Sequence, residues 1–421
     1  MQPSFLNSKK RLIVTIAIVG ALLLLVVILL LSMRKSDGSP YVDVGQDRVM
    51  PRSGGLRGGG GGNYTPKTPK NDVVQFPGGN DSSSEYELPN SEYRKTMAKG
   101  ILNWAHSLRT KNGAYSYGVY CKSSSSCDSQ QADNRAGVAL LWARYRYFEA
   151  THDASELAII DQDLKTYTDR SKVNVIQNDF WNCRMMYDLW KSPLLSAEQR
   201  ALAGEICLRG GYSVKDFKEF YTRGKKASLS DAEINSFMEG KQLVADYPIV
   251  EQMLPSYSAY VSDLIAKNRI KPNDEYLQLA TFYMRRTLQT YSQQAKHQDY
   301  VTALLMIAAH DMYLQTNNPV YNELFQYFYK KITTPMQCQE TRTCGLIAQA
   351  CGELALSTKK SEYRDCYNYH LSQLGISAYD MKNFPGYLLG NGAFRSMNAG
   401  GFFYNITENA VITEALTQFI K

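Results

Sequence analysis

The chain has 421 residues, an ordinary globular composition apart from 30 tyrosines, and a formal net charge of +7. This length accommodates two average domains or a single helical toroid or barrel. The positive charge forms no long basic run and accompanies no recognised nucleic-acid-binding motif, so we expect attraction to acidic surfaces and no nucleic-acid partner.

The first predicted element is a membrane-spanning helix. Residues 12–31, LIVTIAIVGALLLLVVILLL, are uncharged and almost wholly apolar. At 1.5 Å per residue, a segment of this length crosses about 30 Å of hydrocarbon. A cleaved signal peptide is the alternative, but its apolar core is usually about 7 to 15 residues long. We therefore predict a short cytoplasmic N-terminus (1–11) and a single-pass signal anchor (12–32) that attaches the chain to the membrane.

The charges that flank this helix leave its orientation nearly balanced. Lys9, Lys10 and Arg11 precede it, and Arg34 and Lys35 follow it, which slightly favours a cytoplasmic N-terminus. Eight cysteines in four pairs close in sequence are typical of a disulfide-bonded exterior domain. We therefore expect the cell membrane as the location, with the C-terminal domain outside the cytoplasm.

A flexible tether is predicted for residues 33–90. This segment is rich in Gly, Pro, Ser and Asn, as in SGGLRGGGGGNYTPKTPKND. Such a composition buries too little apolar surface to offset the chain entropy lost on folding. A random coil of this length has a typical reach of about 40 Å. Residues 91–421 are then expected to form the folded domain.

Within that domain one pattern occurs three times. The copies are EATHDASEL (149–157), LQTNNPVYNEL (314–324) and LSTKKSEYRDC (356–366). When they are aligned on Thr151, Thr316 and Thr358, the positions eight and twelve residues earlier are small or apolar, as in Ala143 and Ala139. Such residues share one helix face and let neighbouring helices approach closely. We predict inner helices that are surrounded by outer helices and joined to them by short turns.

Twelve helices follow from this reading. Inner helices are predicted to start near Asn134, Phe180, Ile249, Tyr300, Gly345 and Thr407. Outer helices are predicted at 91–108, 154–167, 197–211, 274–291, 319–331 and 361–374. The first outer helix pairs with the last inner one and closes the ring, while LSDAEINSFMEGK adds a short helix within one connection. Pro255 is expected to interrupt the third inner helix, and Ser196 with Gln199 to form a capping box.

The predicted connections differ in length. Turns from inner to outer helices are short, whereas the opposite connections include 109–133, 212–247 and 375–405, beyond the usual span of about 2 to 8 residues. We expect these long loops to gather at one face, above the N-termini of the inner helices, and function to be located there. This face is called the mouth below.

The cysteines agree with this arrangement. Cys351 lies seven residues before Thr358 and Cys366 eight after it, so the two reach similar heights in an antiparallel hairpin. Cys183 and Cys207 flank the 191–196 turn in the same way. The predicted disulfides are Cys183–Cys207 and Cys351–Cys366 between helices, and Cys121–Cys127 and Cys338–Cys344 within mouth loops. A metal site is the alternative, but no CxxC or HExxH motif is present, so we expect no metal and no cofactor.

Three segments carry a resemblance to a known fold. They are ILNWAHSLRTKNGAYSYG (101–118), ADNRAGVALLWARYRYFEATHDASEL (132–157) and the later copies of the repeat. With them, residues 91–421 resemble the six-hairpin, (α/α)6-toroid glycosidase-like superfamily, which implies an all-α toroid of six helical hairpins and a carbohydrate-directed activity. The second segment is similar to bacterial endo-mannanase-like toroids, which carry two adjacent aspartates. Here Ala132 precedes Asp133, so mannanase activity is not implied.

Carboxylates at the mouth are the candidate catalytic groups. Glycoside hydrolysis needs a protonated carboxyl and a carboxylate about 5 to 9.5 Å apart. The candidates, each at or just before an inner-helix start, are Asp133, Asp179, Asp299, Glu340 and Glu408. An aspartate before a helix is commonly an N-cap, which is the alternative for the three aspartates. Because capping lowers a carboxyl pKa, the two glutamates are the better candidates for the acid.

Aromatic and basic residues near the mouth are the candidate substrate-binding groups. Tyr117, Trp181, Tyr300, Phe402 and Tyr404 are predicted to stack on sugar rings. Arg135, Arg342 and Arg395 would favour an anionic group such as a uronic acid. The alternatives are that the aromatic residues pack the loops and that the arginines, Arg184 included, pair with nearby carboxylates.

The sequence therefore predicts a membrane-anchored domain outside the cytoplasm that hydrolyses or modifies a polysaccharide substrate. The alternative is a non-catalytic toroid that binds a glycan, a peptide or a protein at the same face. The oligomeric state does not follow from the sequence.

Overall fold

A computed structural model gives the fold of the domain. It describes residues 90–123, 126–129, 134–173, 181–209, 228–244, 254–294, 299–333, 341–376 and 402–420, all within the second of the chain's two units, Lys67–Lys421. The predicted membrane helix (12–32) lies outside the described residues, as does the predicted tether up to residue 89. Among the helices of the described ranges, none combines the length and apolarity needed to cross a membrane.

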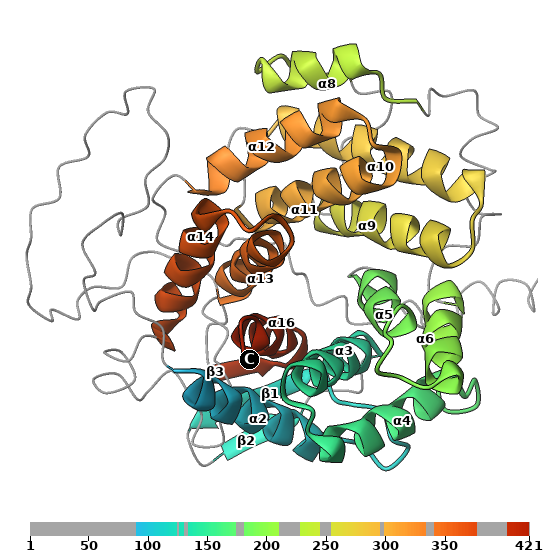
Figure 1. Cartoon of the computed structure of the whole chain (residues 1–421), viewed down its shortest axis with the longest axis vertical. Coiled ribbons are helices and arrows are strands. Elements are labelled where there is room, and N and C mark those ends of the chain that lie inside the picture. The colour runs from blue at the N-terminus through green and yellow to red at the C-terminus, as the bar shows by residue number, and fades with distance from the viewer. Residues whose placement is uncertain are drawn as a thin grey trace, which may run out of the picture. The chain divides into compact units, whose positions relative to one another are not determined.

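Six of the described helices form an inner ring. They are α3 (Asn134–Thr151), α5 (Asn182–Trp190), α9 (Leu254–Ile270), α11 (Asp299–Thr316), α13 (Thr341–Thr358) and α16 (Ile406–Thr417). Each packs against the next, and α16 packs against α3, which closes the ring (Figure 1). Ala139, Ala143 and Ala308 are fully buried, as the repeat predicted. Pro255 does not interrupt α9, because it lies in the first turn, where a missing N–H is tolerated.

The outer helices pair with the inner ones as predicted. They are α2 (Ser91–Ser107), α4 (Ala154–Thr168), α6 (Ala197–Arg209), α10 (Asp274–Ser292), α12 (Pro319–Thr333) and α14 (Ser361–Leu371), with a π-helical turn, Ser372–Ile376, after the last. The other outer helices, from α4 to α14, each pack on the inner helix that precedes them in the chain. The first outer helix, α2, packs on α16. The predicted capping box starts α6, because Ser196 and Gln199 each accept the other's backbone N–H.

The repeated threonine turn joins inner to outer helices at three places. The Thr151 hydroxyl donates to the carbonyl four residues earlier at 2.8 Å and accepts the N–H two residues later at 3.3 Å. Thr316 and Thr358 form the same two bonds. The residues that follow the threonines, His152, Asn317 and Lys359, have positive φ angles of 55° to 62°. A left-handed residue ends one helix and turns the chain into the next, so the repeat is the turn that the sequence predicted.

The connections place the mouth. Turns from an inner helix to its outer partner are short, the longest being 191–196. The opposite connections include residues 210–253 and 377–401, and they enter the inner helices at their N-terminal ends. The 210–253 connection contains the predicted short helix, α8 (Asp231–Met238), which packs on α12. The N-termini of the inner helices, where these connections end, mark the face predicted for function.

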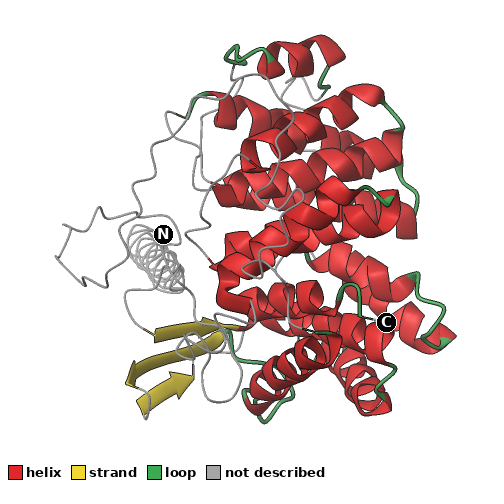
Figure 2. Ribbon diagram, turned by 60° about the vertical axis from the view of Figure 1, so that its left-hand side comes forward, coloured by secondary structure: helices red, strands yellow, loops and turns green. Residues whose placement is uncertain are grey.

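A small antiparallel sheet at the mouth departs from the all-α prediction. β1 (Gly118–Ser123) lies between β2 (Ser126–Ser129) and β3 (Phe402–Asn405) (Figure 2). Because β3 leads directly into α16, the sheet joins the first mouth connection to the last. Valine and aromatic residues in GVYC and FFYN favour extended backbone. The helical interpretation of the sequence overlooked this signal.

Two of the predicted disulfides are present in the described residues. Cys183–Cys207 joins α5 to α6, and Cys351–Cys366 joins α13 to α14. Cys121 and Cys127 are directly opposed in the β1–β2 pair, and their disulfide stays a prediction.

The fourth predicted disulfide is corrected. Cys344 has a free thiol that is fully buried in the first turn of α13. The Cys338–Cys344 bond is therefore not formed. Cys338 itself lies outside the described residues.

Candidate functional site at the mouth and axis of the ring

Two predicted catalytic carboxylates lie at the mouth ends of inner helices. Asp299 is the first residue of α11 and Glu408 the third of α16, and both are partly exposed. The Asn405 side chain caps α16 by accepting the backbone N–H groups of Thr407 at 2.7 Å and Glu408 at 3.3 Å. The Glu408 carboxylate is therefore not needed as a cap. The other predicted carboxylates, Asp133, Asp179 and Glu340, lie outside the described residues.

Trp181 does not present its ring to a substrate, which corrects its predicted role. It is fully buried, and the guanidinium carbon of Arg184 lies 4.9 Å from its ring centroid. A cation–π contact of this kind holds the arginine in place. Tyr117 and Tyr300 are half-buried against the core, so part of each ring remains exposed near the mouth.

The remaining predicted substrate-binding residues are placed by their backbone. Arg135 and Arg342 are the second residues of α3 and α13, and Phe402 and Tyr404 belong to β3. All four positions are on the mouth side of the ring. Arg395 lies outside the described residues.

Toward the opposite end of the ring, one arginine crosses the axis. Arg184 in α5 contacts Asp311 in α11 through Nε at 3.1 Å and Glu353 in α13 through Nη2 at 2.9 Å. In the order of the ring α5 and α13 are opposite each other. The Asp311 side chain is 8% exposed, whereas that of Glu353 is 29% exposed. Glu353 is therefore the more accessible carboxylate of this group. These contacts agree with the sequence-based alternative that Arg184 pairs with carboxylates.

A second ion pair closes the ring between its first and last inner helices. Arg146 in α3 contacts the fully buried Glu414 in α16, Nη2 to Oε1, at 3.1 Å, and it also pairs with Glu149. Gln418 Nε2 donates to both Glu414 oxygens, at 2.8 and 2.9 Å. Burial raises the pKa of Glu414 to about 8, even though Arg146 favours the ionised form. This enclosed carboxyl therefore joins α3 to α16 inside the ring.

A buried aspartate supports the start of α5. Trp181 occupies the N-cap position of this helix without a side-chain capping bond. Asp263 of α9 supplies the acceptor instead, because its Oδ1 accepts the backbone N–H of Arg184 at 2.9 Å. Burial raises the pKa of Asp263 to about 7. The neighbouring inner helix thus caps α5 and fixes the backbone from which Arg184 extends.

The axial charges were missed by sequence reasoning, although the repeat contains a signal for them. Aligned on the three threonines, the position five residues earlier holds Arg146, Asp311 and Glu353. That position is charged in every copy, and it lies three residues after the buried alanine, on the same helix face. A charged residue on an otherwise apolar inner face indicates a partner across the ring.

Comparison with known proteins identifies the fold. No family model matches the sequence, and no curated protein matches it. The solved structures that resemble it include an unsaturated glucuronyl hydrolase specific for heparin, with 11% identity, a TM-score of 0.50, and coverage of 78% of this chain and 97% of that one. A variant of unsaturated glucuronyl hydrolase from Streptococcus agalactiae has 10% identity and a TM-score of 0.51, with 84% and 98% covered.

A third similar structure is described as a possible member of the GH105 family from Salmonella enterica. It has 12% identity and a TM-score of 0.50, with 79% of this chain and 95% of that chain covered. Identities of this size show a shared fold alone. The domain therefore has the six-hairpin (α/α)6-toroid fold that the sequence resemblance predicted.

Proposed function

We propose that the chain is a membrane-anchored toroid, held outside the cytoplasm, that hydrolyses or modifies a polysaccharide at its mouth. The observation that carries this proposal is the position of Asp299 and Glu408 in the first turns of two inner helices, at the mouth end of the ring. Paired carboxyls are the groups that glycoside hydrolysis requires. Solved structures with this fold include an unsaturated glucuronyl hydrolase, which supports carbohydrate as the substrate class.

The two carboxylates are assigned different roles. Asp299 is the proposed base or nucleophile, because the N-terminus of α11 stabilises negative charge at its first residue. Glu408 is the proposed acid, because the Asn405 side chain already caps α16 and the Glu408 carboxylate is not the cap. The partly exposed rings of Tyr117 and Tyr300 support sugar binding beside them.

A non-catalytic binding toroid is the second candidate. It is favoured by the axial contacts, because Arg184 already engages both Asp311 and Glu353. It is also favoured by the burial of Trp181, which removes one predicted stacking surface. If catalysis occurs, its carboxylates must then come from the mouth and not from the axis.

The test is release of reducing ends from a panel of polysaccharides by the full chain and by Glu408→Gln and Asp299→Asn variants. Loss of general acid or base catalysis should lower the rate by about 100-fold or more. Asp274→Asn is the matched control, because Asp274 is the first residue of an outer helix. Rates that survive both mouth substitutions would reject the site assignment. Tight binding with no release on any polysaccharide would select the second candidate.

The proposed location rests on separate observations. Residues 12–31 form an uncharged apolar segment long enough for a membrane, and the disulfides Cys183–Cys207 and Cys351–Cys366 are typical of oxidising compartments. Protease added to intact cells should digest the domain, and the N-terminal fragment should stay with the membrane after alkaline extraction. A domain that resists protease until the cells are permeabilised would contradict this location.

A further inference from the structure

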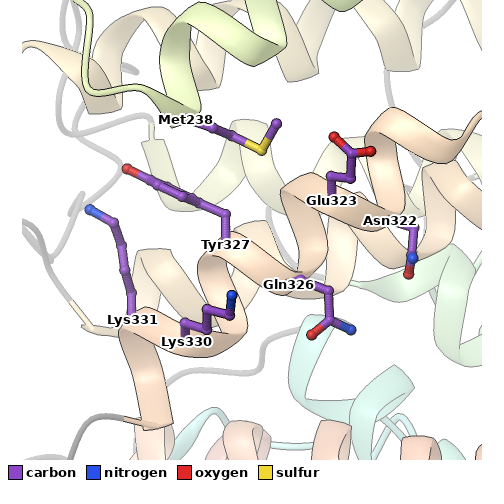
Figure 3. A pocket seen from close by; sticks show the side chains of 7 residues that line it. All are labelled: Met238, Asn322, Glu323, Gln326, Tyr327, Lys330 and Lys331. Carbon is purple, nitrogen blue, oxygen red and sulfur yellow. The ribbon is translucent and has the colours of Figure 1, made fainter. Parts of the chain in front are cut away.

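A cavity of about 550 Å³ lies outside the ring, between α8 and α12 (Figure 3). One wall is formed by two rows of side chains on α12, each spaced by four residues. The rows are Asn322, Gln326 and Lys330, and Glu323, Tyr327 and Lys331. Met238 at the end of α8 forms the other wall. Residues four apart lie on one helix face, so the six α12 side chains form a continuous surface about 12 Å long.

The α8 wall is held in place by the body of the domain. Phe237 is buried against Tyr327, with ring centroids 5.5 Å apart, and against Phe328 at 5.8 Å. Glu233 forms an ion pair with Arg285 of α10 at 3.2 Å. Asp231 accepts a hydrogen bond from Asn318 at 2.9 Å. These contacts fix the position of α8 and so of the wall that Met238 forms.

The chemistry of the lining combines planar polar groups with one aromatic ring. The side chains of Asn322 and Glu323 form no hydrogen bond or ion pair with the described residues, and Glu323 is exposed. The Nζ of Lys331 lies 4.8 Å from the Tyr327 ring centroid. Amide groups donate and accept hydrogen bonds and a carboxylate accepts them, while Tyr327 and Met238 offer apolar surface. Such a combination suits a ligand with hydroxyl groups on one side and C–H groups on another.

The lining argues against the usual peptide ligands. The described wall has no open sheet edge, no wholly apolar groove and no arginine cluster, which are the features that bind strands, amphipathic helices and phosphopeptides. Because the same wall carries the Glu323 carboxylate as well as two lysines, a strongly charged polyanion is also disfavoured. A neutral or weakly anionic oligosaccharide satisfies the amides, the carboxylate and the aromatic ring together.

One end of the cavity lies at the mouth end of α12. α12 runs antiparallel to α11, so the end of α12 that carries Lys330 and Lys331 is the mouth end. We propose that this cavity is a second carbohydrate-binding site, which holds a neutral or weakly anionic polysaccharide along α12 while another part of the same polymer reaches the mouth. The inference rests on the proposed function for its substrate class and adds a binding surface that is separate from the mouth.

The test is affinity electrophoresis of the full chain in gels that contain soluble polysaccharides, both neutral and uronic-acid-containing. The Asn322→Ala/Glu323→Ala double variant removes polar groups that the core does not use. The affinity for the polysaccharide, which retardation measures, should fall by about tenfold or more in this variant. Each lost hydrogen bond contributes about 1 kcal/mol, and 1.4 kcal/mol is a factor of ten in affinity. Glu198→Ala, at an exposed position of α6, is the control and should bind as the unaltered chain does.

The outcomes separate this inference from the proposed function. The double variant should release reducing ends from short oligosaccharides at an unchanged rate, whereas its rate of release from polymer should fall. Polymer binding that survives in an inactive Glu408→Gln variant and is lost in the double variant would support the second site even if the mouth proves non-catalytic. Equal retardation of the double variant and the control, or no retardation by any polysaccharide, would overturn it. Binding of an acidic peptide in place of polysaccharide would overturn the ligand class.

Discussion

Arg184 and Glu353 meet at 2.9 Å across the axis of the ring, although they are brought there by opposite inner helices. The same guanidinium binds Asp311 from a third inner helix. Asp263, from a fourth, caps the turn on which Arg184 lies. One residue thus connects four of the inner helices, through its guanidinium and its backbone N–H, and the ring is closed at its centre as well as around its circumference.

Removing this arginine should destabilise the domain strongly. Arg184→Met removes the cation that contacts the largely buried Asp311 and Glu353, and breaking a buried pair in this way costs about 3 to 5 kcal/mol. The control is Lys165→Met, which breaks a solvent-exposed pair with Asp161 and should leave the midpoint almost unchanged. Urea denaturation measures both. Equal midpoints for the two variants would show that the axial contacts do not stabilise the ring.

The left-handed residues of the threonine turns should be open to stabilisation. Lys359 and His152 have φ angles of 62° and 55°, where a side chain costs about 1 to 2 kcal/mol that glycine avoids. After the greater chain entropy of unfolded glycine is subtracted, Lys359→Gly and His152→Gly should each raise the free energy of unfolding by about 0.5 to 1 kcal/mol. Asn317→Gly should gain less, because asparagine tolerates this conformation. Thermal melts that rank Asn317→Gly first would contradict the explanation.

The disulfide between α13 and α14 should contribute measurably to stability. Replacing Cys351 and Cys366 together by alanine should lower the free energy of unfolding by about 2 to 4 kcal/mol, because the unfolded chain is no longer cross-linked. Cys344→Ala is the control, since its buried thiol is free. Denaturant titrations under non-reducing conditions compare the variants. A loss at Cys344 as large as that of the disulfide pair would indicate that Cys344 is cross-linked after all.

The stability of the domain should fall as the pH rises through neutrality. Burial raises the pKa of Glu414 from its ordinary value of 4.5 to about 8. The folded state then binds the proton more tightly than the unfolded state, so this contribution to stability is complete below about pH 4.5 and is lost by about pH 8. Glu414→Gln cannot titrate, and the change in melting temperature between about pH 5 and pH 9 should be smaller in this variant. An identical pH dependence would refute the assignment.

Local signals in the sequence were sufficient for the helices and their alternation. Apolar periodicity, alanines at helical spacing and a threonine turn repeated three times predicted the inner and outer helices, the turns between them, and two of the disulfides. These features depend on residues close together in the chain, where spacing decides which side chains share a face. The same periodicity predicted Asp299 and Glu408 near the starts of inner helices, where α11 and α16 begin.

Tertiary structure alone decided which distant residues meet. It paired the GVYC and FFYN segments into a sheet, buried Trp181 beneath Arg184, and brought Asp311 and Glu353 to one guanidinium. A charged residue five positions before each threonine indicates that an oppositely charged partner exists. It does not indicate which helix supplies that partner. The partner is set by closure of the ring, because opposite helices come within reach only after all six hairpins have packed, and no spacing along the chain encodes that distance.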